Sequence, residues 1–174
     1  MFRSLVILAL FLPTLMTAQN SDSCPCCTEN HRAFDFWIGE WEVVNAKDGS
    51  PAGTSRISKE ENGCVIREHW TSAKAGYTGT SLNFYNAERD TWEQSWVDNT
   101  GAVLKLSGNR KGNKMILSSD EFTKADGKTY TNRITWTNNP DGTVRQLWEV
   151  LDEKGAVSVA FDGLYRPMQK TKNR

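Results

Sequence analysis

The segment that decides the fold is Thr78-Gly-Thr-Ser-Leu-Asn-Phe-Tyr-Asn-Ala-Glu-Arg-Asp-Thr-Trp-Glu-Gln-Ser-Trp-Val-Asp98. Two runs of strand-forming residues flank the turn-forming stretch 86–90, which predicts an antiparallel hairpin. If Asn86 lies opposite Thr91, one face of this hairpin collects polar and aromatic side chains: Ser81, Asn83, Tyr85, Trp92, Gln94 and Trp96. A barrel that binds a small molecule needs such a mixture, whereas a barrel that only fills its core favours aliphatic residues.

The opposite face of the hairpin carries Leu82 and Phe84. A shift of one residue in the pairing would send these two side chains inward and the amides into solvent. We expect the first arrangement, with the aromatic and amide face inside.

The rest of the chain repeats the pattern of short strands and tight turns. From residue 40 onward we expect ten strands: Trp41–Asn45, Thr54–Lys59, Cys64–Thr71, Thr78–Tyr85, Thr91–Asp98, Ala102–Ser107, Lys114–Ser118, Lys128–Thr137, Thr143–Leu151 and Val157–Tyr165. Gly- and Asn-containing turns such as Asn139-Pro-Asp-Gly142 separate them. No stretch of ten or more residues keeps a helical apolar period, so only Glu29–Phe36 is expected to form a helical turn.

Short connections between the strands determine the architecture. Consecutive strands joined by tight turns must be antiparallel, because parallel neighbours need long crossovers. Closing the sheet removes its two exposed edges. A two-sheet sandwich is the alternative, but sandwiches usually contain longer Greek-key connections. The sequence therefore predicts an all-β protein, a closed antiparallel up-and-down barrel of about ten strands with a short N-terminal helical turn.

The N-terminus predicts export. A basic residue, Arg3, precedes the apolar run Leu5–Leu12, and Ala18 is the expected cleavage point of a signal peptide that covers residues 1–18. The apolar run is too short to span a bilayer. We divide the remainder into a Cys-containing segment (19–33), one barrel domain (34–167) and a basic tail (168–174), and expect a secreted or periplasmic protein.

Charge is balanced, with 21 basic and 21 acidic residues and no stretch that concentrates Lys or Arg. Nucleic acids and anionic membrane surfaces favour a basic patch, so neither is predicted as a partner. The expected partner is a small molecule of unknown identity, and the oligomeric state is not predicted.

Four cysteines are present, at positions 24, 26, 27 and 64. In an oxidising compartment cysteines form disulfides by default, and one of the three complete pairings would need a strained bond between Cys26 and Cys27. We expect a bridge from the 24–27 cluster to Cys64, and assign it to Cys27, although the residue types leave Cys24 and Cys26 open. A thiolate site for Cu(I) or Zn at the cluster is the alternative. No second cysteine pair supports it, so no metal ligands are assigned.

Other strands extend the predicted binding face. Tyr130, Asn132, Ile134 and Trp136 share one face of their strand, and Val144, Gln146, Trp148 and Val150 share one face of the next. If Ile66 and Trp70 point inward, so does Glu68, and a buried carboxylate must be paired or protonated. The complete set of predicted ligand-binding residues is Glu68, Trp70, Asn83, Tyr85, Trp92, Gln94, Trp96, Asn132, Trp136, Gln146 and Trp148.

Catalytic signals are weak. The two histidines are His31 and His69, and the strand pattern places His69 on the outer side beside Arg67. No nucleophile elbow or His-Glu-x-x-His segment occurs. Asp98 and Asp162 lie at strand ends, where acidic residues commonly bind turn backbone groups. We therefore assign no catalytic residue and predict no cofactor.

Four segments resemble a bacterial lipocalin-like (calycin-type) domain family of unknown function. The first, Phe34-Asp-Phe-Trp-Ile-Gly-Glu-Trp-Glu-Val43, contains a Gly39-x-Trp41 pair similar to the lipocalin entry motif. The others are 62–70, Trp92-x-Gln-x-Trp96-Val-Asp98 and Phe161-Asp-Gly-Leu-Tyr165.

The resemblance implies an up-and-down barrel with a cavity, structural roles for Trp37 and Trp41 at the closed end, and a bond between Cys64 and a cysteine ahead of Phe34. It brings no activity or ligand. Related haem barrels take a proximal histidine from a late strand, and this chain has no histidine after His69. The haem site is therefore not carried over.

Three functional hypotheses follow. The first is an exported carrier or sensor that holds a small, partly apolar molecule between the aromatic residues and orients it with polar groups such as Gln94 and Glu68. The second is a small barrel enzyme, a hydrolase or isomerase, in which Glu68 acts with His69 or Asp98 as acid and base. The third is a filled barrel that works through a protein partner.

Overall fold

A computed structural model of the chain describes residues 24–155 and 157–169. The predicted signal peptide and most of the basic tail lie outside the described residues.

Eleven strands make up most of the described chain. They are β1 (Gly39–Asn45), β2 (Pro51–Glu60), β3 (Val65–Ser72), β4 (Thr78–Asn86), β5 (Thr91–Asp98), β6 (Val103–Lys111), β7 (Lys114–Ser118), β8 (Phe122–Thr123), β9 (Thr129–Asn138), β10 (Val144–Asp152) and β11 (Val157–Pro167). The short helical elements are α1 (Glu29–Arg32), η1 (Asp35–Trp37) and η2 (Glu61–Gly63). The ten strands expected from the sequence are all present, and the helical turn expected over Glu29–Phe36 corresponds to α1 and η1. The two-residue β8 was not predicted.

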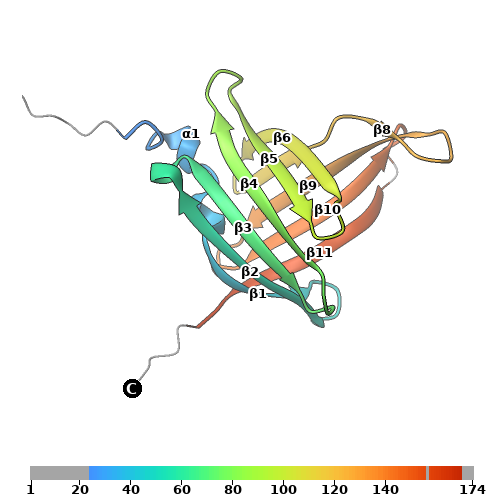
Figure 1. The fold of residues 1–174 in the computed structure, drawn as a ribbon, viewed down its shortest axis with the longest axis horizontal. Coiled ribbons are helices and arrows are strands. Elements are labelled where there is room, and N and C mark those ends of the chain that lie inside the picture. Colours follow the sequence, from blue (N-terminus) through green and yellow to red (C-terminus); the bar gives the residue numbers. More distant parts are fainter. Residues whose placement is uncertain (1–23, 156, 170–174) are drawn as a thin grey trace, which may run out of the picture.

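The sheet closes into a barrel (Figure 1). The strands from β1 to β7 pair antiparallel in chain order, β7 pairs next with β9, and β9, β10 and β11 continue the order back to β1. The short β8 pairs with the start of β9. The predicted closed antiparallel barrel of ten strands is therefore confirmed, and the sandwich is excluded because β11 and β1 join without a free edge.

The register of the β4–β5 hairpin sets which side chains face inward. Asn86 pairs with Thr91, and Asn83 pairs with Gln94, as the sequence predicted. Ser81 is fully buried, whereas its neighbour Leu82 is 44 % exposed. The aromatic and amide face therefore points into the barrel. Leu82, on the opposite face, points to solvent.

The N-terminal segment covers one end of the barrel, and the β1–β2 and β3–β4 turns lie at the opposite end (Figure 1). Thr28 caps α1 by accepting a hydrogen bond from the backbone N–H of His31. The Trp92 indole donates to the carbonyl oxygen of Asn30 at 3.0 Å, and the Arg110 guanidinium donates to that of Ala33 at 3.1 Å. These bonds fix the segment across the end of the barrel where β4–β5 and β6–β7 turn.

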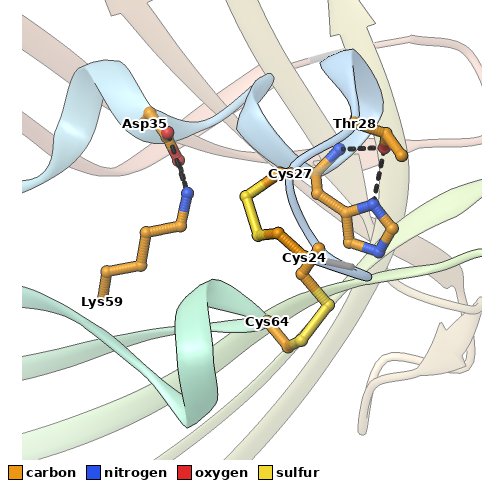
Figure 2. Close-up of a disulfide and its surroundings, with 8 residues drawn as sticks. Cys24, Cys27, Thr28, Asp35, Lys59 and Cys64 are labelled. Atoms are coloured by element: carbon orange, nitrogen blue, oxygen red, sulfur yellow. Dashed lines mark hydrogen bonds and ion pairs between the residues drawn. A yellow bond between two sulfur atoms is a disulfide. The ribbon is translucent and has the colours of Figure 1, made fainter. Parts of the chain in front are cut away.

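Two disulfides involve the N-terminal segment, and one of them joins it to the barrel (Figure 2). Cys26 bonds to Cys64, at the β2–β3 end, and Cys24 bonds to Cys27. The assignment of Cys27 to Cys64 is therefore corrected. The backbone N–H of Cys27 bonds to the carbonyl of Cys24, and this turn brings their Cα atoms to 5.4 Å. Cys26, between them, is the cysteine that is directed toward the barrel and is buried.

An ion pair supports the same attachment. The ammonium of Lys59 on β2 lies 2.7 and 2.8 Å from the two carboxylate oxygens of Asp35 in η1 (Figure 2). Both side chains are partly exposed, so the pair contributes at most about 1 kcal/mol. The Cys26–Cys64 disulfide therefore holds the segment to the barrel more strongly than this ion pair does.

We predict unequal costs for removing the two disulfides. Cys26 and Cys64 are 38 residues apart and Cys24 and Cys27 are 3 apart. From loop-closure entropy we expect the Cys26→Ser/Cys64→Ser variant to lose about 4 kcal/mol of its free energy of unfolding. The Cys24→Ser/Cys27→Ser variant should lose about 2 kcal/mol. Urea unfolding of the oxidised proteins measures both losses. Equal losses, or peptide mapping that joins Cys27 to Cys64, would contradict the pairing.

Candidate functional site

The barrel holds a cavity of about 410 Å³ at the end opposite the N-terminal segment. Its aromatic lining comes from five strands: Trp70, Trp96, Trp136, Trp148, Phe161 and Tyr165. Its polar lining includes Glu68, Gln94 and Gln146, with Lys74 and Tyr77 of the β3–β4 connection at the mouth. The cavity is therefore an aromatic chamber with a few polar groups, the composition that small-molecule sites share.

Glu68 supplies the carboxyl group of the cavity wall. It lies on β3 and is 4 % exposed. Ser55 on β2 donates its hydroxyl to Oε1, and Ser81 on β4 donates to Oε2, each at 3.0 Å. Burial raises the pKa of Glu68 to about 7, because the carboxylate loses its hydration, and the two hydroxyls lower it in part.

A chain of hydrogen bonds connects Glu68 with Gln94. The amide nitrogen of Asn83 donates to the carbonyl of Ile66 and to the hydroxyl of Ser81, at 3.0 Å each. Because the carbonyl can only accept, this contact sets the orientation of the Asn83 amide. The Asn83 oxygen then accepts from the Gln94 nitrogen at 2.6 Å, which leaves the Gln94 oxygen as the end that can accept from a ligand. The wall therefore presents acceptors to the cavity.

Hydrogen bonds from their polar atoms hold two of the aromatic side chains, Trp148 and Tyr165, in place. The Trp148 indole donates to the Asn132 oxygen at 2.8 Å, and the Tyr165 hydroxyl donates to the Gln146 oxygen at 2.5 Å. Burial, and to a lesser degree the charge of Glu68, raise the pKa of Tyr165 well above its ordinary value, so this phenol stays neutral. These bonds fix the rings before any ligand arrives.

Glycines allow the rings to lie close to the strands. A Cβ at Gly79 would lie 2.2 Å from the Trp96 ring, and one at Gly163 would lie 2.5 Å from the Phe161 ring. Any larger residue at either position would therefore displace a ring that lines the cavity. The volume of the cavity depends on these two positions.

The other end of the barrel is filled by aromatic packing. Phe34 and Trp37 are fully buried and stack with ring centroids 5.0 Å apart, and Trp37 lies 5.4 Å from Trp136. The Trp41 indole donates to the Trp37 carbonyl at 2.9 Å. Within the described residues the indole N–H groups of Trp37 and Trp136 have no hydrogen-bond partner. Both nitrogens are themselves buried, so neither is a ready contact for a ligand.

The predicted ligand-binding residues divide into two sets. Seven line the cavity: Glu68, Trp70, Gln94, Trp96, Trp136, Gln146 and Trp148. The other four point inward or toward an end but support the structure elsewhere. Asn83 orients the polar chain, Asn132 holds Trp148, Trp92 packs against Phe34, and the Tyr85 hydroxyl bonds to Asn30 and Asp90.

Several residues of the cavity escaped the sequence analysis. Tyr77, Phe161 and Tyr165 line it, and Ser55 binds Glu68. Phe161 and Tyr165 flank Gly163 at alternate positions of β11, so strand periodicity could identify them. Ser55 and Tyr77 carry no comparable local signal.

Among the described residues, neither of the two expected acid–base partners, His69 and Asp98, forms a hydrogen bond with Glu68. Buried residues on β3 alternate with less buried ones, and His69 follows Glu68, so its side chain lies on the opposite face. Asp98 accepts hydrogen bonds from Thr100 and Ala102 in the β5–β6 turn and from the Tyr77 hydroxyl. The hydrogen bond from the Thr100 hydroxyl is the main cause that lowers the pKa of Asp98 to about 2.

A scan against protein-family models and a search of curated proteins each found no match to this chain. Among residues 24–155 and 157–169, no helix is long and apolar enough to cross a membrane. The same described residues contain no group of three or more His, Cys, Asp and Glu side chains placed to hold a metal ion.

We predict that Gly79→Ala destabilises the protein by about 1–3 kcal/mol, because the added methyl group overpacks against Trp96. The combination with Trp96→Leu removes the ring that the methyl meets. The cost of the double variant should then be smaller than the sum of the two single costs, as measured by urea unfolding. Strictly additive costs would show that the two residues do not meet.

We also predict a pH dependence of stability that originates at Glu68. Its pKa is about 7 in the folded protein, against 4.5 for an unperturbed glutamate carboxyl. The unfolded chain therefore releases this proton first as the pH rises. The stability that the protonated Glu68 contributes is complete below pH 4.5 and is lost by about pH 7. The contribution of Glu68 to the free energy of unfolding should fall by about 3 kcal/mol over this range.

Glu68→Gln should remove this part of the pH dependence, and Glu42→Gln, an exposed residue of β1, serves as the control. Carboxyl NMR titration measures the Glu68 pKa directly. A value near 4.5 would contradict the burial argument.

Proposed function

We propose that this protein is an exported carrier or sensor that binds a small, partly apolar molecule inside its barrel. The observation that carries the proposal is the cavity of about 410 Å³ with aromatic walls and a buried carboxyl. Pockets that bind small molecules span about 300–1,000 Å³ and combine apolar walls with a few polar groups. This cavity lies at the lower end of that range, which favours a compact ligand.

The rigidity of the walls supports binding rather than simple packing. Trp148 and Tyr165 are each held by a hydrogen bond from the ring's polar atom, and Trp96 lies against Gly79. A site arranged before the ligand binds loses less side-chain entropy on association. The presence of the cavity also argues against a filled barrel that acts only through a protein partner.

The cysteines support the exported part of the proposal. All four form disulfides in the described structure. Structural disulfides persist in oxidising compartments and are rare in the cytosol. The signal peptide proposed for residues 1–18 accounts for how the chain would reach such a compartment. Membership in the lipocalin-like family is proposed on the four sequence segments alone.

Acid–base catalysis is the second candidate function. A carboxyl whose pKa is about 7 and that lines an open cavity has the proton affinity that a general acid or base needs. However, His69 lies on the opposite face of β3, Asp98 is engaged by Thr100, Ala102 and Tyr77, and Tyr165 is held neutral. Binding therefore has more support than catalysis.

Native mass spectrometry of the protein isolated from its own host tests the proposed function. We expect a bound mass that is lost on denaturation, and that is reduced in a Trp96→Ala/Trp148→Ala variant because two walls of the cavity are removed. A ligand recovered chemically unchanged after incubation supports a carrier, whereas a shifted ligand mass supports catalysis. A bare protein that also binds no small aromatic compound in calorimetry would refute the proposal.

A further inference from the structure

The cavity contains a carboxyl group without a cationic partner. Among the described residues that line the cavity, the one basic side chain is Lys74, which is exposed at the mouth. Glu68 takes part in none of the ion pairs of the described chain. Its two contacts, Ser55 and Ser81, are neutral hydroxyls. When Glu68 ionises, its negative charge is therefore compensated by hydrogen bonds alone.

The hydrogen-bond pattern leaves room for a donor from a ligand. Each carboxylate oxygen has about two acceptor sites. One hydroxyl binds each oxygen, so each oxygen of Glu68 retains capacity toward the cavity. The Ser81 hydroxyl accepts from Asn83, so its own hydrogen is free to go to Glu68, and the Gln94 oxygen adds another acceptor. The polar wall is thus suited to a ligand group that donates several hydrogen bonds.

The aromatic lining favours the same kind of ligand. Indole rings attract cations to their faces, most strongly where water is excluded. Four indoles, those of Trp70, Trp96, Trp136 and Trp148, surround the cavity. An ammonium group on a flat apolar body would pair with Glu68 through its charge and with the walls through its body.

We propose that the cavity selects a compact organic cation, a protonated amine on a flat apolar body, with Glu68 as its counter-ion. This inference rests on the proposed function. A neutral or anionic ligand of the same shape would leave the carboxylate unpaired or bring a second negative charge beside it.

Proton linkage predicts whether ligand affinity rises or falls with pH. Glu68 bonds to Ser55 of β2 and Ser81 of β4, lies opposite Ile57 in the β2–β3 pairing, and shares the cavity wall with Gln94, Gln146 and Tyr165, with Tyr77 and Lys74 at the mouth. The pKa of Tyr165 lies well above its ordinary value and that of Tyr77 is raised to about 12, so neither phenol ionises near neutrality, whereas the pKa of Glu68 is about 7. A bound cation stabilises the carboxylate, so binding near pH 7 releases protons and strengthens as the pH rises.

A protonated Glu68 that acts as a donor predicts the opposite pH dependence of ligand affinity. A protonated Glu68 that donated a hydrogen bond to a ligand carbonyl or carboxylate would make binding weaken as the pH rises, with proton uptake. The direction of the pH dependence therefore distinguishes the two cases, whatever the natural ligand is.

Isothermal titration calorimetry with three compounds that share one ring system tests the proposal: 1-naphthylmethylamine, 1-naphthalenemethanol and 1-naphthoate. At about pH 8 the amine is still mostly protonated. We expect it to bind roughly 10- to 100-fold more tightly than the alcohol, and the carboxylate to bind most weakly, because a charge-assisted contact replaces a neutral one. Amine affinity should rise from about pH 5.5 to about pH 8, with proton release seen as a dependence on buffer ionisation enthalpy.

Two variants complete the test. Glu68→Gln should lower the amine affinity roughly 10- to 100-fold and change the alcohol affinity less than about 2-fold, whereas Glu42→Gln on the outer face of β1 should change neither. Near-UV circular dichroism checks that Glu68→Gln retains the native packing, and the pH series on the unmodified protein does not depend on that variant.

The outcomes separate the two proposals. If the alcohol binds and the amine binds no more tightly, the ligand class is refuted while the binding function stands. If affinity falls with pH and the carboxylate binds best, the protonated-Glu68 arrangement replaces ours. If none of the three compounds binds, the ligand class is refuted, and the binding function is refuted as well where the native mass spectrum also shows a bare protein.

Discussion

The stacking of Phe34 on Trp37 inside the barrel is the contact on which the rest of the structure depends. Ten strands enclose more space than their own inward side chains fill, because the diameter of a barrel grows with strand number. The N-terminal segment fills this space at one end with two fully buried rings. The space at the other end stays open and forms the cavity. The position of the cavity is thus set by a segment that belongs to no strand of the sheet.

The covering segment and the cavity share side chains, so their properties are connected. Trp136 contacts Trp37 on one side and lines the cavity on the other, and Tyr165 does the same. The Cys26–Cys64 bond and the Lys59–Asp35 pair hold the segment to the β2–β3 end. A loosened segment would therefore move the floor of the cavity as well as expose the core. This coupling explains why a chain with a closed sheet still benefits from a disulfide outside it.

The fold could be predicted from local patterns, whereas the site could be predicted only in part. Strand periodicity and turn residues determine a register such as Asn83 opposite Gln94, and alternation determines that both point inward. Alternation does not encode depth along the barrel, so Trp92 and Trp96 looked equivalent although one packs on Phe34 and the other lines the cavity. The partner of Cys64 was missed for a related reason, because the direction of three neighbouring cysteines depends on a backbone turn.

The buried carboxyl is the feature that packing alone does not explain. Burying Glu68 costs free energy, and Ser55, Ser81 and Asn83 are needed to reduce that cost. Apolar residues at these inward positions would fill the barrel and avoid the desolvation. Positions that violate the local rules of a well-packed core are where function is expected. The network around Glu68 is oriented toward an open chamber rather than closed on itself, and this orientation is what connects the departure from packing to the binding of a ligand.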